Sequence, residues 1–378
     1  MRHKIILIYI MVAPYRTPLF NEMWNYFREQ WYDFKVIFTS EIESNRKWDI
    51  QKEIDKFTFD YEILNSKQLK INSNKDNHFF HFNFDFNKII NKEKPDIIIH
   101  TWWASLTAWQ SCLWCKKNKA KYILWNESTK YENSWRRTIT KPVVKYLVRN
   151  SDAYISFGSR SKEYLEILWA NKNKIFEFYN TVDIDFFVNE AKKLKPIKEE
   201  LKHKYWIKTK YVLLFVWQLI ERKWIYEILS WFEKFKNINN DISLIFVWWW
   251  QEKENLEKII KENNINDVFF PWFFQIDKIW ELYAIADIFT LPSIEEVWGL
   301  VINEAMCFWL PILTAYKVWA SPDLVIEWKN GFIMKEYTWD EFEKWIKYIF
   351  DNNLIEKNNS LEIINKMRIA NFIKNLKI

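Results

Sequence analysis

Glycine is almost absent from this chain of 378 residues, and its scarcity limits the folds open to the sequence. Average usage predicts roughly 26 glycines in this length, whereas the chain has 3 glycines and 25 tryptophans. Turns with a positive φ, and places where two backbones approach closely, favour a residue without a Cβ atom. Because the surplus of tryptophan nearly matches the deficit of glycine, the question is whether the tryptophans occupy positions that need glycine.

Many tryptophans follow a strand-like run or end a helix-like one, where a large α/β protein needs glycine. Trp217 follows the apolar run 211–216, and the tryptophans at 248–250, Trp249 among them, follow the run 242–247. Turn-like contexts also surround Trp31, Trp169, Trp206, Trp224, Trp272, Trp309, Trp319 and Trp328. Four others lie where an aromatic is natural, namely Trp48, Trp125, Trp135 and Trp298.

We interpret this distribution as the result of a genetic code in which UGA specifies glycine. The tryptophans translated from UGA codons would then stand for glycine. The composition, rich in Lys, Asn and Ile, suits an AT-rich gene. The alternative is a genuinely tryptophan-rich protein, such as a sugar-stacking lectin, whose indoles would share one exposed face. UGG codons at 217 and 248–250 would contradict our interpretation.

The composition is that of an ordinary globular protein, with 49% hydrophobic and 28% charged residues. A net charge of +6 is too weak and dispersed for a nucleic-acid partner. The three cysteines, Cys112, Cys115 and Cys307, indicate a reducing compartment without a disulfide framework. No apolar run reaches the roughly 18 residues of a membrane span, and His78 and His81 lie in a polar loop that does not favour a metal site.

Short apolar runs alternate with amphipathic segments in two successive halves, which predicts an α/β fold of two doubly wound Rossmann-like domains facing across a cleft. Strands fit residues 4–12, 34–39, 96–100, 121–125, 153–157 and 174–179, then 211–216, 242–247, 267–270, 287–291 and 311–314. Helices fit 17–30, 104–118, 140–150 and 160–169, then 224–237, 252–263, 277–285 and 300–308.

The expected domains are residues 1–190, which bind the acceptor, and 205–350, which bind a donor. Residues 351–378 are expected to carry a helix, over 360–376, that packs back across both. The polar, aromatic stretch 66–87 is expected to be a variable loop, and 189–204 a solvated linker.

The stretch 291–311, LPSIEEVWGLVINEAMCFWLP, is the most informative part of the sequence. Gly299 opens a helix whose free amides and positive end suit a diphosphate. Glu304, about a turn and a half into that helix, can accept hydrogen bonds from vicinal ribose hydroxyls. Glu296, on the preceding loop, can accept them from a sugar ring.

Here the chain resembles the family 4 glycosyltransferases of the GT-B fold, which are retaining, metal-independent enzymes. The resemblance covers essentially the whole chain and is strong over 205–335. Its motifs are E-x7-E with the helix EAMxxGLP (296–311), VGxLxxxKG (216–224), NxVDxxxF (180–187), LYAIADIFTLPS (282–293) and GxNGF (328–332). Tryptophan stands at the family's glycine positions except at Gly299 and Gly331.

By this resemblance, Lys223, supported by Arg222, neutralises the donor diphosphate. Glu296 holds the transferred sugar and Glu304 the ribose. Gln218 stands where the family often has arginine, so it brings a hydrogen bond but no charge. The remaining donor-binding positions are Trp217, Trp249, Gly299 and Leu300. If the residues at 217 and 248–250 are truly tryptophan, they fill the phosphate site and we expect an inactive protein.

The first half should bind the acceptor. Arg16, in the loop 13–18, could meet an anionic acceptor, and Glu127 and His100 end strands at the same edge. For Glu127 and His100, a satisfied polar group at a strand end is an equal alternative. A basic stretch would suit an anionic membrane surface, with a solvated helix face as the alternative; it comprises Lys130, Arg136, Arg137, Lys141, Lys145 and Arg149.

The resemblance implies a glycosyltransferase that uses a UDP- or GDP-sugar without a cofactor or metal. Its acceptor would be a saccharide or lipid-linked molecule in cell-surface polysaccharide or glycolipid synthesis, and its place the cytoplasm or the inner face of the membrane. One alternative is a nucleotide-sugar epimerase of GT-B architecture, which would need no acceptor. The other is a tryptophan-rich carbohydrate-binding protein, which would bind sugar without a nucleotide.

Overall fold

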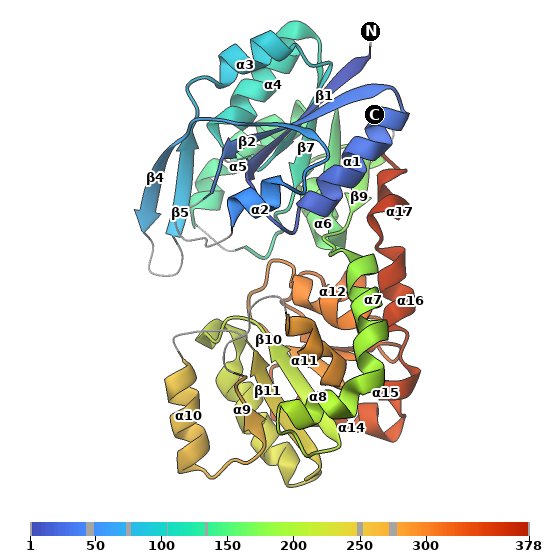
Figure 1. Cartoon of the computed structure of the whole chain (residues 1–378). Helices are drawn as coiled ribbons and strands as arrows, with labels where there is room; N and C mark the ends of the chain where they lie inside the picture. The colour runs from blue at the N-terminus through green and yellow to red at the C-terminus, as the bar shows by residue number, and fades with distance from the viewer. Residues whose placement is uncertain are drawn as a thin grey trace. The chain divides into compact units, whose positions relative to one another are not determined.

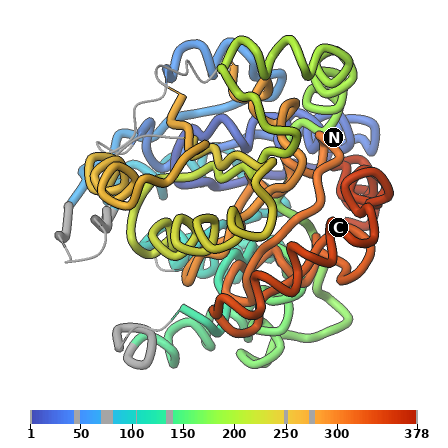
Figure 2. The backbone as a smooth tube through the Cα atoms, turned by 90° about the horizontal axis from the view of Figure 1, so that it is seen from below, coloured from blue at the N-terminus to red at the C-terminus, as the bar shows by residue number. Residues whose placement is uncertain are grey.

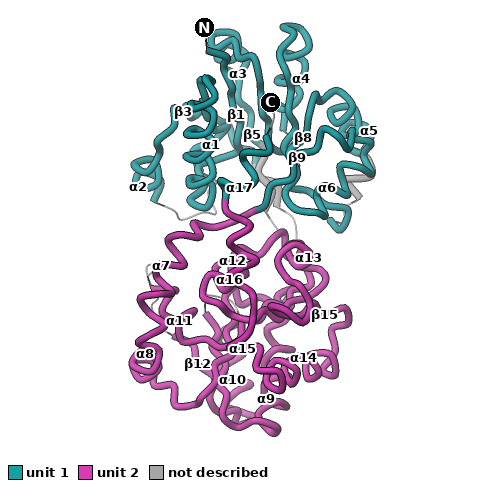
Figure 3. Tube along the Cα trace, turned by 90° about the vertical axis from the view of Figure 1, so that its right-hand side faces the viewer, with its two compact units in different colours: residues 1–179, 369–378 teal, residues 180–368 magenta. Residues whose placement is uncertain are grey.

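A computed structural model describes residues 2–42, 49–72, 77–103, 105–132, 135–247, 252–271 and 278–376. The chain divides into two compact units, which Figure 3 colours separately. Unit 1 comprises residues 1–179 and 369–378, and unit 2 comprises residues 180–368. Both chain ends, marked in Figure 2, therefore belong to unit 1.

The described part of unit 1 is built on a parallel sheet in the order β3-β2-β1-β6-β7-β8-β9. The strands are β1 (His3–Met11), β2 (Tyr32–Ser40), β3 (Asp60–Ile63), β6 (Ile97–Thr101), β7 (Lys121–Asn126), β8 (Ala153–Phe157) and β9 (Ile175–Phe178). Side chains of β1 alternate between two cores: Ile5 and Leu7 enter one, and Ile6 and Ile8 enter the other. Both faces of the sheet are thus covered, which explains the continuous apolar run.

Helices cover this sheet, and the end of the chain returns to it. They are α1 (Thr17–Glu29), α2 (Ile50–Ile54), α3 (Phe86–Glu93), α4 (Leu106–Asn118), α5 (Trp135–Arg149), α6 (Gly158–Ile167) and the terminal α17 (Ile369–Ile373). α17 packs against α1 and β9 (Figure 1). The loop expected over 66–87 is instead an antiparallel hairpin of β4 (Lys67–Asn72) and β5 (Asn77–Phe82), followed by the start of α3.

The described part of unit 2 has a parallel sheet in the order β12-β11-β10-β13-β14-β15. Its strands are β10 (Tyr211–Val216), β11 (Ile242–Val247), β12 (Val268–Phe269), β13 (Ile288–Leu291), β14 (Ile312–Ala315) and β15 (Gly331–Met334). Its main helices are α7 (Ile184–Leu194), α8 (Lys198–Lys204), α9 (Ile225–Lys236), α10 (Lys253–Glu262), α11 (Ile279–Ile285), α12 (Leu300–Cys307), α14 (Trp339–Asp351) and α16 (Ser360–Lys366). The sequence pattern did not predict β3, β15, α2 or α14. The α/β prediction with two Rossmann-like domains is confirmed.

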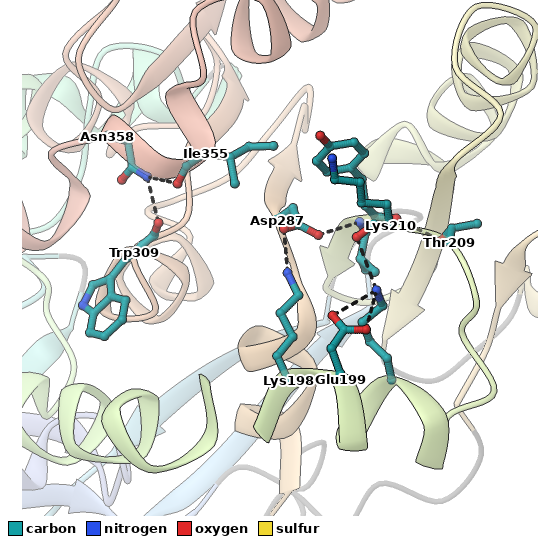
Figure 4. A network of polar contacts seen from close by, with 11 residues as sticks. Lys198, Glu199, Thr209, Lys210, Asp287, Trp309, Ile355 and Asn358 are labelled. Carbon is teal, nitrogen blue, oxygen red and sulfur yellow. Dashed lines mark hydrogen bonds and ion pairs between the residues drawn. The ribbon is translucent and has the colours of Figure 1, made fainter. Parts of the chain in front are cut away.

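The stretch 189–204, expected as a solvated linker, is largely helical. α7 packs against α11 and α12, and α8 packs against α11. Lys198 of α8 donates to Asp287 Oδ1 at 2.6 Å, and Asp287 Oδ2 accepts from the amide of Val212 at 2.9 Å (Figure 4). These contacts attach the segment to unit 2, so the division falls at 179/180 and not at 190. The expected single tail helix is likewise two helices, α16 in unit 2 and α17 in unit 1.

Seven described tryptophans adopt a φ between 58° and 73°, the left-handed region that residues with a Cβ rarely occupy. They are Trp31, Trp102, Trp169, Trp206, Trp224, Trp309 and Trp328. All but Trp102 are among the turn-like positions that the sequence marks. Trp217 and Trp319 lack a positive φ, and 248–250 and 272 lie outside the described residues.

Three of these tryptophans end helices in the same way. At Trp169, Trp206 and Trp309 the residue's own amide donates to the carbonyl three residues back, and the next amide donates to the carbonyl five residues back. This is the Schellman helix end, whose left-handed position usually carries glycine or asparagine. Asn264 has this geometry after α10. Figure 4 shows the carbonyl of Trp309 also accepting from Asn358, at 2.9 Å.

The tryptophans expected to be genuine behave differently. Trp125 is fully buried and stacks on Phe157 at 4.6 Å between ring centroids. Trp298 is buried and donates from Nε1 to Asn303 at 3.1 Å. Neither has a positive φ. Trp48 lies outside the described residues, as does the side chain of Trp135.

Candidate functional site

In unit 2 the chain order of the strands reverses between β10 and β13, which pair directly. Ligands of doubly wound sheets bind outside the carboxyl ends of the strands at such a reversal. Trp217 and Gln218 follow β10, and Glu296 lies on the loop after β13. The fold therefore brings together residues that are about 80 positions apart in the sequence.

The central contact is an ion pair between Lys223 and Glu296. Lys223 Nζ lies 2.5 Å from Glu296 Oε2 and donates to the carbonyl of Glu295 at 3.1 Å. The Lys223 side chain is 1% exposed and that of Glu296 is 7% exposed. Burial lowers the pKa of Lys223, although the Glu296 carboxylate opposes this shift. The ammonium also lies 5.3 Å from the ring centroid of Trp217, which covers it.

The loop that carries Glu296 is fixed through its backbone. The backbone carbonyl of Glu296 accepts from the amide of Trp319 at 3.1 Å, and Glu296 forms an isolated β-bridge with Val318. Gly299 precedes α12 with a φ of +87°, and a Cβ there would lie 3.0 Å from a methyl of Leu291. The left-handed φ and the nearby methyl both favour glycine, and Gly299 opens α12 as the sequence predicts.

Glu304 lies on α12 and is held by Tyr283 of α11. The Tyr283 hydroxyl, fully buried, donates to Glu304 Oε2 at 2.6 Å. Burial raises the pKa of Glu304 to about 7, while the Tyr283 hydrogen bond opposes the rise. Tyr283 belongs to the motif at 282–293, but nothing in its spacing signals this contact.

The other predicted donor residues differ in exposure. Gln218 is exposed, whereas Arg222 and Leu300 are half-buried. The backbone carbonyl of Arg222 accepts from the amide of Ile294 at 3.1 Å, which ties the segment after β10 to the loop after β13. Trp249 lies outside the described residues. The roles assigned to these residues stay predictions.

In unit 1, Arg16 is buried and paired with other side chains. It donates from Nη2 to Glu127 Oε1 at 2.6 Å and from Nε to the Tyr9 hydroxyl at 2.9 Å. Rings of Tyr9, Trp125 and Phe157 lie within 6 Å of its guanidinium carbon. Burial opposes the charge, yet Glu127 and Tyr9 outweigh it and raise the pKa of Arg16. Its charge is therefore balanced by Glu127, as that of Lys223 is by Glu296, and its role toward an acceptor stays a prediction.

His100 is also satisfied within the protein. Its Nδ1 contacts the carbonyl of Thr101 at 2.5 Å, and its Nε2 lies 3.1 Å from Thr107 Oγ1. Burial lowers the pKa of His100 to about 3, so the ring is neutral at physiological pH. This geometry matches the alternative of a satisfied polar group at a strand end.

Unit 1 has its own reversal of strand order, between β1 and β6, and a cavity of about 190 Å³ lies there. The lining residues come from β1, β2, β5, β6 and the region where α4 begins: Tyr9, Ile10, Thr39, His81, Phe82, His100, Thr101, Trp102, Ser105 and Leu106. None of these described residues is an acid, a lysine or an arginine. Of the three predicted acceptor residues, only His100 borders the cavity.

A second contact missed by sequence reasoning reaches the start of unit 2. Asn303 of α12 accepts from Trp298 and donates to the backbone carbonyl of Asn180 at 3.1 Å. Asn303 is fully buried, so this chain of bonds anchors the first residue of the unit beside the loop that carries Glu296.

The described residues contain no group of three or more His, Cys, Asp or Glu side chains placed to hold a metal ion. None of their helices combines the length and apolar character that crossing a bilayer requires. Metal independence stays a prediction.

Comparison with known families places unit 2. Residues 197–367 match the family described as glycosyl transferases group 1. This stretch contains Lys223, Glu296 and Glu304. Residues 197–367 of unit 2 therefore resemble the group 1 glycosyl transferases.

Two curated relatives are uncharacterized glycosyltransferases. That of Methanocaldococcus jannaschii is 23% identical over 233 residues, covering 61% of this chain and 57% of the relative. That of Haemophilus influenzae is 26% identical over 238 residues, covering 61% of each. The matched stretch spans less than two thirds of either relative.

Solved structures resemble the chain over nearly its full length. A glycosyltransferase from Rickettsia africae has a TM-score of 0.72 at 18% identity, covering 99% of this chain and 96% of that one. Anabaena HepE in complex with UDP has a TM-score of 0.75 at 14% identity, covering 98% of each chain. At these identities the likeness shows the fold alone, and that fold is the predicted pair of Rossmann-like domains.

Proposed function

We propose that this protein is a retaining, family 4 glycosyltransferase that moves a sugar from a UDP- or GDP-sugar to a saccharide or lipid-linked acceptor. The observation that carries the proposal is the meeting of Lys223, Glu296 and the amino end of α12 at the strand reversal of unit 2. The group 1 domain over 197–367 supports it. HepE, a protein of the same fold, binds UDP, which favours a UDP-sugar.

The ion pair gives each partner a role in donor binding. A donor diphosphate competes with Glu296 for Lys223, and the freed carboxylate then accepts hydrogen bonds from the sugar. The bond between the sugar C1 and the phosphate oxygen breaks with its electron pair on the phosphate, where Lys223 and Arg222 stabilise the charge. The acceptor oxygen bonds to C1 on the same face, and its proton leaves with the nucleoside diphosphate. Glu304 accepts from the ribose hydroxyls, and no metal or cofactor is required.

We place the reaction in the cytoplasm at the inner face of the membrane, in cell-surface polysaccharide or glycolipid synthesis. Helix α5 carries Lys141, Lys145 and Arg149 beside Val143 and Tyr146, which are 44% and 42% exposed. Basic and apolar side chains together suit an anionic lipid surface. The three cysteines are free and buried, which suits a reducing compartment.

We also propose that the left-handed tryptophans are glycine in the native protein. A left-handed L-residue costs about 1–2 kcal/mol, so seven cost about 7–14 kcal/mol, as much as the net stability of a domain. Trp31 and Trp206 are 72% and 83% exposed, so their indoles bury little to offset this cost. The seven residues are distributed over different elements of both units, three of them at helix ends. Glycine at 217 would also uncover Lys223.

Codons and peptide masses test this second proposal directly. UGA codons at the left-handed positions, and glycine masses in peptides from the native host, are the expected results. UGG codons at 206 and 309 would contradict it.

Thermal shift tests the transferase proposal. With glycine restored at the suspect positions, we expect a UDP- or GDP-sugar to raise the melting temperature. Lys223→Met should abolish the shift. The control Lys258→Met, at an exposed lysine of α10, should keep it. A shift with free sugar alone would favour the carbohydrate-binding alternative, and conversion of the nucleotide sugar without an acceptor would favour the epimerase.

A further inference from the structure

The cavity of unit 1 lies where a doubly wound sheet binds its ligand, at the carboxyl ends of β1 and β6. Its volume is about 190 Å³. Ile10, Phe82 and Leu106 supply apolar walls, together with the ring of Tyr9. Position and lining together mark it as a binding site for an uncharged group.

The polar side chains of the cavity already have partners in the protein. The hydroxyls of Thr39 and Thr101 donate to backbone carbonyls of β1, each at 3.0 Å. His100 is neutral, and both its ring nitrogens contact oxygen atoms. A phosphate or a sugar ring entering here would lose hydration without gaining matching partners, which is costly. A hydrocarbon segment loses nothing comparable and gains from burial.

Arg16, which the sequence predicts to meet an anionic acceptor, does not change the preference of the cavity for a hydrocarbon segment. Its guanidinium is paired with Glu127 and does not line the cavity. Trp102 forms part of the wall with a positive φ. Glycine at that position would remove one indole from the lining, which still contains Ile10, Phe82 and Leu106.

We infer that this cavity binds a short hydrocarbon segment of the acceptor, so that the acceptor is a glycoside attached to a lipid or alkyl chain. This inference rests on the proposed transferase function, because it takes unit 1 to hold the acceptor. It narrows the proposed acceptor, a saccharide or a lipid-linked molecule, to a glycoside that carries a hydrocarbon chain. The sugar of such an acceptor lies outside the cavity.

The test compares hexyl glucoside, methyl glucoside and glucose 1-phosphate as ligands of the full chain, by isothermal titration calorimetry. Each methylene that enters the cavity should raise affinity about fourfold, so hexyl glucoside should bind at least roughly tenfold more tightly than methyl glucoside. Leu106→Asp places a carboxylate at the cavity and should remove most of this preference. The matched control is Leu113→Asp, on the same helix, similarly exposed (53% against 50%) and not lining the cavity; it should keep the preference.

Equal binding of the two glucosides, tighter binding of glucose 1-phosphate, or equal losses in Leu106→Asp and Leu113→Asp would each overturn the inference. A protein that is stabilised by UDP-sugars but shows no preference for the hexyl chain refutes the acceptor class and keeps the transferase. A protein that prefers the hexyl chain but ignores nucleotide sugars refutes the transferase.

Discussion

Trp206 ends helix α8 in the left-handed conformation, with a φ of +58° and an indole that is 83% exposed. Exchanging it for glycine measures directly how much strain a tryptophan adds at such a position. The two backbone bonds of the helix end, from the amides of Trp206 and Ile207, do not involve the side chain. The exchange therefore leaves the hydrogen bonds of the turn in place.

The expected magnitude follows from two opposing terms. Relief of the left-handed strain contributes about 1–2 kcal/mol, and the greater backbone freedom of unfolded glycine costs about 0.5–1 kcal/mol. Because the indole is mostly exposed, little burial is lost. Trp206→Gly should therefore raise the free energy of unfolding by about 0.5–1 kcal/mol. Alanine keeps the Cβ and the strain, so Trp206→Ala should not share the gain.

Urea unfolding followed by far-ultraviolet circular dichroism measures the effect. With a typical dependence on urea, the midpoint should rise by about 0.2–0.5 M in Trp206→Gly relative to Trp206→Ala. Trp125→Gly is the opposite control: its indole is fully buried with no positive φ, and its loss should cost at least about 3–5 kcal/mol. A midpoint of Trp206→Gly at or below that of Trp206→Ala would refute the reasoning.

Three further changes test the rest of the structure. Tyr283→Phe removes the hydrogen bond that holds down the pKa of Glu304, now about 7. Nucleotide affinity needs the ionised carboxylate and therefore falls as the pH drops through that pKa. In the variant the midpoint of this fall should lie about 1–2 pH units higher, and an unchanged pH profile would contradict this expectation. Lys223→Met leaves Glu296 buried without its partner and should cost about 3–5 kcal/mol in urea unfolding, most of it recovered when Glu296→Gln is added; additive losses would show that the pair is not coupled. Gly331→Ala brings a Cβ to 2.0 Å from a backbone oxygen of β14, so it should lower the melting temperature by several degrees, and an unchanged value would show that the strands can separate.

The local features of this protein could be predicted from its sequence. Apolar runs such as 211–216 and 242–247 became strands with the expected bounds, because a strand buried on both faces must be continuously apolar. The left-handed positions at Trp169, Trp206 and Trp309 could also be predicted, because a helix end depends on a few neighbouring residues. Segment 189–204 was predicted to be a linker but is largely helical, because its many charges suit a solvated helix as well as a linker.

Contacts between distant residues were decided by the tertiary structure. Glu127 lies 111 positions from Arg16 and forms an ion pair with it, which the sequence does not reveal. Tyr283 donates a hydrogen bond to Glu304 from another helix, and the cavity of unit 1 joins the ends of three strands with a hairpin. Sequence periodicity reports which face of an element is buried, whereas charge balance and cavity shape depend on which elements the chain brings together. The sequence by itself therefore determined the architecture and the positions of several left-handed helix ends, while only the folded chain decided which of its charged groups pair with one another.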